Sequence, residues 1–129
     1  MKLEKNMYVR TKDGYIDKII DTTEEWYELD GDEEEKLYKI YKLNKYYYDE
    51  EFDEETKWFL ERFFVKASHN IIDLIEVEDY VNGNEVVEKG YNIVMVTNRW
   101  GNRLTYTNED IKSIVTKEQF KSISYEVSK

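Results

Sequence analysis

The feature that most constrains this chain is the stretch from Glu24 to Glu55, in which acidic and aromatic side chains are interleaved. The stretch contains fourteen carboxylates and four lysines, so it carries the whole formal net charge of −10, and the rest of the chain is neutral. It also contains eight aromatic side chains. Acidic runs without aromatic residues are typical of disordered tails. The aromatic residues of this stretch predict instead that it folds and presents its carboxylates in fixed positions.

The length and composition limit the architecture and the chemistry. A chain of 129 residues is long enough for one domain with a modest core, or for two very small ones. The chain has no cysteine, which excludes disulfides and thiolate zinc sites. His69 is its one histidine, so a monomer cannot build a metal site from several histidines. We therefore expect neither a metal nor a cofactor.

The charge and the hydropathy pattern indicate a location and a class of partner. The N-terminus has no apolar run of signal-peptide length, and no run approaches the roughly 20 apolar residues of a membrane span. We expect a cytoplasmic protein that does not enter a membrane. A sequence pI near 4.7 opposes long-range attraction to nucleic acids and to anionic membranes. Basic partners are favoured.

The first half of the chain shows several strand and turn signals. Met7 to Asp21 reads as a hairpin around Asp13-Gly14, because glycine accepts a positive φ without steric cost. A third strand is predicted at Trp26 to Leu29, before a turn at Asp30-Gly31. A fourth is predicted at Leu37 to Leu43.

The segment from Phe52 to Val65 has a helical period. Asp53 is a suitable N-cap, and Phe59 and Phe63 are four residues apart, as side chains on one helix face are. We expect a helix of about three turns here. A strand around Phe63 to Lys66 is the competing interpretation.

The second half reads as short strands separated by polar turns. The dipeptide Asn82-Gly83 is the strongest short hairpin signal. A turn is predicted at Arg99 to Asn102, and a single helical turn capped by Thr116 at Thr116 to Phe120. Strands are predicted at Asp79 to Val81, Glu85 to Lys89, Asn92 to Thr97, Arg103 to Thr107, Ile111 to Val115 and Ile123 to Val127.

These signals together predict a mostly β (α+β) fold with short-stranded antiparallel sheets. The segments YVRTKDGYIDKII, from Tyr8, and YVNGNEVVEK, from Tyr80, resemble each other. One interpretation is that all short hairpins look alike. The other is two small SH3-like barrels joined by a short helix, with an N-terminal β subdomain over residues 1–66 and a C-terminal one over 67–129.

Three segments also carry a resemblance to a known family. They are Tyr8 to Gly14 (YVRTKDG), Asn70 to Gly83 (NIIDLIEVEDYVNG) and Ile111 to Phe120 (IKSIVTKEQF). In these segments the chain resembles a family of small uncharacterised proteins of phages and prophages of AT-rich bacteria. The resemblance implies a phage or mobile-element origin and brings no catalytic residues. Glu78 departs from it, because similar proteins often have glycine there.

The acidic stretch suggests a function as a nucleic-acid mimic. Carboxylates held by a β scaffold would occupy a basic groove of a host protein, possibly an RNA-guided nuclease, and would pair with the Lys and Arg side chains that normally hold phosphates. An exposed tyrosine would anchor the contact. The expected partner-binding residues are Glu28, Asp30, Asp32, Glu33, Glu34, Glu35, Tyr47, Asp49, Glu50 and Glu51. The competing interpretation is a solvated acidic face that keeps the protein soluble.

Other function classes have weaker support. A structural or accessory phage adaptor would bind by apolar contact. A single-strand nucleic-acid module would use Arg99, Trp100 and Arg103, against the net charge. The carboxylates after Asp30 lack the spacing of a calcium loop. No phosphate loop or nucleophile motif supports catalysis by His69 with Asp73 and Glu76, so we expect a non-enzymatic protein.

Overall fold

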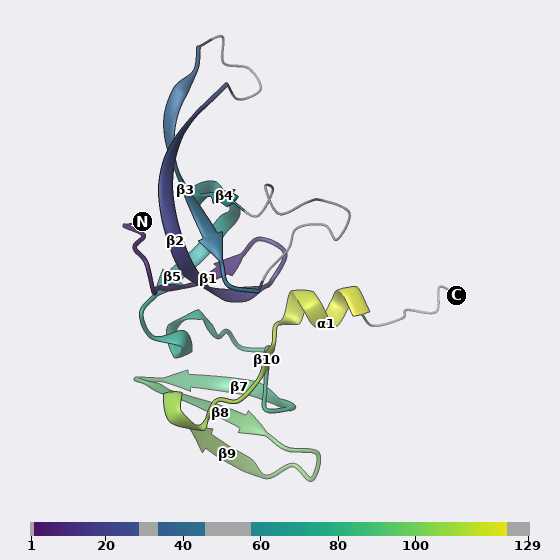
Figure 1. Cartoon of the computed structure of the whole chain (residues 1–129). Helices are drawn as coiled ribbons and strands as arrows, with labels where there is room; N and C mark the ends of the chain where they lie inside the picture. Colours follow the sequence, from purple (N-terminus) through teal and green to yellow (C-terminus); the bar gives the residue numbers. More distant parts are fainter. Residues whose placement is uncertain (1, 29–33, 46–57, 124–129) are drawn as a thin grey trace, which may run out of the picture.

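The computed structural model describes residues 2–28, 34–45 and 58–123, and most of its regular elements are β-strands (Figure 1). The strands form two antiparallel sheets of five strands each. The mostly β architecture predicted from the sequence is therefore confirmed.

The first sheet is built by the N-terminal half of the chain. Its strand order is β4-β3-β2-β1-β5. A 3-10 helix, η2 (Glu61–Phe63), joins the fourth strand to the fifth. The strands are β1 (Tyr8–Thr11), β2 (Ile16–Tyr27), β3 (Lys36–Leu43), β4 (Trp58–Leu60) and β5 (Phe64–Ser68).

The second sheet follows another 3-10 helix, η3 (Ile71–Leu74), and has the order β10-β6-β7-β8-β9. A third, η4 (Asn108–Asp110), lies before its last strand, and α1 (Lys117–Ile123) comes after that strand. The strands are β6 (Tyr80–Val81), β7 (Asn84–Gly90), β8 (Ile93–Thr97), β9 (Arg103–Tyr106) and β10 (Ile114–Val115).

The two sheets repeat one topology. In each, the fifth strand lies beside the first, the other three follow in sequence order, and a 3-10 helix precedes the fifth strand. Val9 in β1 and Val81 in β6 are both fully buried. The likeness between the segments from Tyr8 and Tyr80 thus extends to the strand order around them. The predicted boundary between residues 66 and 67 lies within β5.

Each sheet has its own apolar core. The first gathers Val9 and Ile19 with Tyr41, Phe59 and Phe64, so aromatic side chains supply much of its volume. The second is aliphatic and contains Ile72, Ile75, Val81, Val86, Val94 and Val96. Burying one such side chain contributes about 1.5–3 kcal/mol, and these contacts fix which face of each strand points inward.

Two turns require the residues found in them. Asn82 and Gly83 both have positive φ, 52° and 82°, as a two-residue type I′ hairpin needs. Gly14 has φ 91°, and a Cβ atom there would lie 2.6 Å from Thr116 Oγ1 and from Glu118 Cβ. The turn between β1 and β2 therefore packs against the start of α1, where only glycine fits (Figure 1).

Thr116 caps α1 and also holds that turn. Its hydroxyl accepts a hydrogen bond from the Gln119 amide at 3.2 Å, and the Gln119 side chain accepts one from the Thr116 amide at 3.0 Å. This reciprocal pair is a capping box. The same hydroxyl donates to the Gly14 carbonyl at 2.5 Å. The predicted cap is confirmed, and α1 runs to Ile123, beyond the single turn predicted at Thr116 to Phe120. The cap links the turn between β1 and β2 to α1.

The predicted helix from Phe52 to Val65 is wrong over its described part. Residues 58–65 form β4, η2 and the start of β5, so the competing strand near Phe63 to Lys66 is correct. Phe59 and Phe63 do stack, with ring centroids 5.0 Å apart. The turn of η2, and not an α-helix, brings the two rings together. Residues 52–57, with the predicted cap Asp53, lie outside the described residues.

Three predicted strands differ from the structure. The expected third strand at Trp26 is the end of β2, which runs unbroken from Ile16 to Tyr27 because every residue from Asp21 to Tyr27 pairs with β3. The strand predicted at Ile111 to Val115 is reduced to β10. Ile123 belongs to α1, and residues 124–127 of the last predicted strand lie outside the described residues.

The two sheets are joined by a buried arginine. Arg10 of β1 is 1% exposed, and its guanidinium donates to both carboxylate oxygens of Asp79, at 2.5 and 3.0 Å. It also donates to the Leu74 carbonyl at 2.9 Å and to Glu118 of α1 at 2.6 Å.

Asp79 is fully buried, and its carboxylate accepts hydrogen bonds from the backbone amides of Glu76 and Lys117. Burial opposes the charge of Arg10, but Asp79 and Glu118 outweigh it and raise the pKa.

Glu76 extends this ion network to two lysines. Its carboxylate lies 3.0 Å from Lys66 Nζ of β5 and 2.8 Å from Lys117 Nζ of α1. Burial opposes ionisation of Glu76, but the hydrogen bonds from Lys117 and Lys66 and the charge of Arg10 lower its pKa to about 2. The carboxylate is therefore charged at neutral pH and compensates the cations around it.

The strained backbone at Glu78 gives a first prediction. Glu78 has φ 80°, a conformation that costs an L-residue about 1–2 kcal/mol, and its side chain is exposed. We expect Glu78→Gly to raise the free energy of unfolding by about 1 kcal/mol, because glycine adopts this conformation without strain.

Urea unfolding measures this effect, with Val77→Gly as the matched control. Val77 is exposed and has an ordinary φ, so glycine there should lower the free energy of unfolding by about 0.5–1 kcal/mol. Equal destabilisation by both substitutions would contradict the assignment of strain to residue 78.

Candidate functional site

The candidate site is the two-stranded ribbon formed by β2 and β3. Figure 1 shows these strands running together away from β1 and β5. Their register pairs Glu24 with Lys39 and Tyr27 with Lys36. Burial falls along the ribbon, so that residues 23–28 and 34–37 are all exposed. The described part of the acidic stretch thus lies on a projecting element.

One face of the ribbon carries an exposed apolar pair. Trp26 and Leu37 are cross-strand partners, and 61% of Trp26 and 48% of Leu37 is exposed. Cross-strand partners lie on the same face, as do alternate residues of a strand. Tyr41, four residues after Leu37, therefore lies on this face too, but it is buried in the first core. The charged pair Glu24–Lys39 lies between Tyr41 and Leu37 on this face, so the exposed Trp26–Leu37 pair is separate from the core.

The other face contains a groove of about 540 Å³. Ile40 is buried beneath it, the exposed carboxylates of Asp21 and Glu25 line it, and Tyr27 and Trp58 supply aromatic rings. Carboxylates beside aromatic rings suit Lys or Arg side chains, because both groups attract a cation. The groove can therefore accept basic side chains of a partner.

The structure describes three of the ten predicted partner-binding residues. Glu28, Glu34 and Glu35 are exposed, and they flank the paired ends of β2 and β3. The seven others lie outside the described residues, and they are Asp30, Asp32, Glu33, Tyr47, Asp49, Glu50 and Glu51.

Sequence reasoning missed the ribbon faces. Trp26 and Tyr27 are flanked by acidic residues in the sequence, and this pattern was the one indication that they belong to a binding surface. The face of the ribbon on which each of them lies follows from the continuation of β2 to Tyr27. The predicted strand break before Trp26 left these faces unassigned. Trp58 reaches the groove because β4 pairs with β3, a contact that no local pattern indicates.

A second exposed aromatic lies in the loop between β8 and β9. Trp100 is 70% exposed, and the guanidinium carbon of Arg99 lies 4.2 Å from the centre of its ring. The Asn98 side chain accepts hydrogen bonds from the amides of Trp100 and Asn102, at 3.0 and 2.9 Å. The loop thus presents an ordered Trp–Arg stack.

The residues considered for catalysis have separate partners. His69 is 3.9 Å from Glu4, the Asp73 carboxylate accepts a hydrogen bond from Ser68, and Glu76 is held by Lys66 and Lys117. Among the described residues, no group of three or more His, Cys, Asp or Glu side chains could hold a metal ion.

Comparison of the chain with protein-family models, curated proteins and solved structures finds no match. Within residues 2–28, 34–45 and 58–123, no helix has the length and apolar character needed to cross a membrane. The function of the chain must therefore be inferred from its own residues and geometry.

The exposure of the ribbon gives a second prediction. The double substitution Trp26→Ala with Leu37→Ala should lower the free energy of unfolding by at most about 1 kcal/mol, the value of one cross-strand pair. Phe59→Ala, a matched aromatic truncation in the first core, should cost about 3–5 kcal/mol. Urea unfolding followed by circular dichroism compares the variants. A cost for the ribbon variant equal to that of Phe59→Ala would show that the pair is packed and is no docking surface.

Proposed function

We propose that this chain is a non-enzymatic binding protein that inserts its β2–β3 ribbon into a basic groove of a host protein. The single observation that carries the proposal is the ribbon itself, which projects from the sheet with exposed carboxylates and aromatic rings. Trp26 and Leu37 lie beside each other and are both exposed. Adjoining exposed apolar side chains are typical of interaction surfaces.

The dimensions and the chemistry of the ribbon fit a groove. Five residues at about 3.3 Å each give the exposed part of β2, from Thr23 to Tyr27, a length of roughly 16 Å. Carboxylates at its edges would accept hydrogen bonds from Lys and Arg, while Trp26 and Tyr27 would bury aromatic area at the centre of the contact. Charge would direct the encounter, and the aromatic contact would slow dissociation.

The partner we propose is a nucleic-acid-handling protein of a bacterial host, with an RNA-guided defence nuclease as the first candidate. A groove that holds phosphates presents Lys and Arg, and fixed carboxylates satisfy the same donors. The net charge of −10 and the resemblance of Tyr8–Gly14 and Asn70–Gly83 to phage proteins support an inhibitor made by a phage or prophage. Its site of action would be the cytoplasm of the host.

We also propose that the two halves are small SH3-like barrels. The repeated strand order, with the fifth strand beside the first, supports this assignment. The first unit would then carry the binding ribbon, and the second would be a related scaffold with a shorter hairpin, β7–β8.

Two observations favour other functions. The exposed Trp26–Leu37 pair also suits a phage adaptor that binds another protein by apolar contact, with the acids only solubilising. The Arg99–Trp100 stack suits a single-stranded nucleic acid, whose bases stack on aromatic rings. Salt separates the first from the mimic, because apolar contact is not screened. Filter binding with oligonucleotides tests the second.

Charge reversal tests the proposed function. The triple variant Glu28→Lys, Glu34→Lys, Glu35→Lys changes only exposed residues at the end of the ribbon. We expect its affinity for a purified RNA-guided nuclease, measured by biolayer interferometry, to fall about tenfold or more, since each lost pair contributes up to about 1 kcal/mol. Inhibition of DNA cleavage should fall in parallel, and wild-type affinity should weaken with added salt.

The matched control is Glu85→Lys, Glu88→Lys, Glu109→Lys, which makes the same charge change at exposed positions of the second half. Its affinity should change less than about twofold, because these side chains would lie outside the contact. Equal losses in the two triple variants would reduce the effect to net charge. Unchanged affinity of the ribbon variant, or salt-insensitive binding, would reject mimicry and favour the adaptor.

A further inference from the structure

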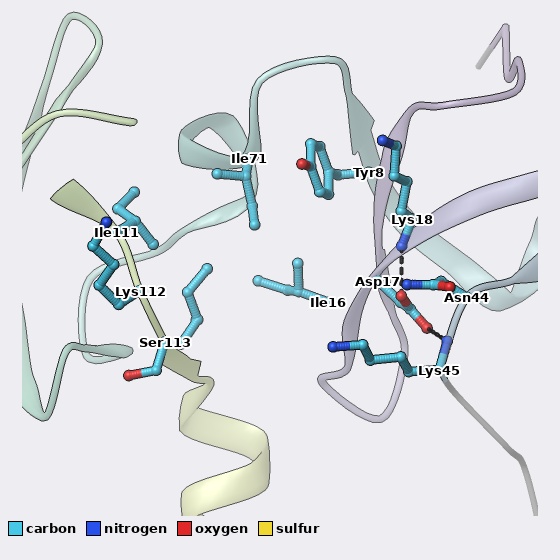
Figure 2. Close-up of a pocket in the computed structure, with 11 residues that line it drawn as sticks. Tyr8, Ile16, Asp17, Lys18, Asn44, Lys45, Ile71, Ile111, Lys112 and Ser113 are labelled. Atoms are coloured by element: carbon cyan, nitrogen blue, oxygen red, sulfur yellow. Dashed lines mark hydrogen bonds between the residues drawn. The ribbon is translucent and has the colours of Figure 1, made fainter. Parts of the chain in front are cut away.

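A cleft of about 490 Å³ lies where the two halves of the chain meet (Figure 2). One wall comes from the first half, with Tyr8 of β1, the start of β2 and the residues after β3. The other comes from the second half, with Ile71 of η3 and residues 111–114. The volume is in the range of small-molecule sites, about 300–1,000 Å³.

The charge of this cleft is opposite to that of the chain. Lys18, Lys45 and Lys112 line it, and among the residues that the structure describes Asp17 is the one acidic residue in its wall. The Asp17 carboxylate accepts the backbone amides of Lys18 and Lys45, both at 2.7 Å. Its charge is thus directed at the protein backbone. Figure 2 shows the Lys45 side chain reaching into the cleft and Lys18 beside the Tyr8 ring. An anion is the favoured occupant.

The rest of the lining is apolar with a few polar groups. Ile16, Ile71 and Ile111 line the cleft and are only partly buried. Figure 2 shows Ile16 and Ile71 pointing toward its centre. A ligand that covers these isoleucines removes apolar surface from water, which favours binding. The Asn44 amide and the Ser113 hydroxyl line the same space and supply donors and acceptors. This combination is typical of pockets for small organic ligands.

We propose that the cleft binds a nucleoside monophosphate. The phosphate would pair with Lys45, and the base would lie against the isoleucines and Tyr8. Asn44 and Ser113 would bond the edge of the base or the ribose. The exposed Asn44 and Ser113 interrupt the apolar lining, so an acyl chain would meet polar groups along the cleft, which favours the nucleotide. This site is separate from the ribbon and does not depend on the function proposed above.

NMR titration of the full chain tests the proposal, with AMP, adenosine and inorganic phosphate as probes. AMP should shift the amide signals of Ile16, Lys45 and Ser113 and saturate in the millimolar range or below. Adenosine and phosphate alone should each bind at least about tenfold more weakly, because each makes only half of the contacts. Lys45→Gln should weaken AMP binding at least about threefold.

Two further variants sharpen the test. Ser113→Glu places a carboxylate on the exposed wall and should abolish AMP binding by repulsion. Lys36→Gln, at the far end of the ribbon, makes the same charge change as Lys45→Gln and should leave binding unchanged. The proposal is overturned if AMP shifts none of the cleft signals, if phosphate binds as tightly as AMP, which would mark an adventitious ion only, or if Lys36→Gln weakens AMP as much as Lys45→Gln.

Discussion

The buried pair of Arg10 and Asp79 is the interaction on which the arrangement of the two sheets depends. Neither side chain reaches solvent, and removing a charge from water costs several kcal/mol, so each must keep its partners. Arg10 meets this requirement with Leu74, Asp79 and Glu118, which lie between the sheets and at the start of α1. A hydrophobic contact would tolerate sliding, whereas this fork of charged hydrogen bonds sets one orientation. The cleft between the two halves is lined by residues of both, so its shape depends on that orientation.

The repeated topology separates scaffold from specialisation. Both halves bury β-branched residues at equivalent strands, Val9 in β1 and Val81 in β6. They differ in the hairpin that follows the first strand. In the second half β7 and β8 are seven and five residues long, while β2 and β3 reach twelve and eight and leave the core. The described acidic and aromatic residues Glu24, Glu25, Trp26 and Tyr27 lie on this extension, where the first unit departs from the second.

The features that sequence reasoning predicted are local ones. Asp13-Gly14 and Asn82-Gly83 predicted their hairpins because the conformation of a turn depends on the residues within it. The Thr116 cap was predictable for the same reason. The helix around Phe59 was wrong because a four-residue spacing of aromatic rings also arises when a strand turns through a 3-10 helix. Arg10 could not be predicted, since its partners Asp79 and Glu118 are 69 and 108 residues away and leave no periodic signal.

The central claim is that Arg10 makes the two sheets one cooperative unit, and native-state hydrogen exchange tests it most directly. In the wild type, the slowest amides of β1 and β8 should exchange with the same free energy of opening, because neither sheet opens alone. In Arg10→Lys, which keeps the charge but not the fork, the two values should separate. Two different values in the wild type, or one shared value that persists in Arg10→Lys, would contradict the account.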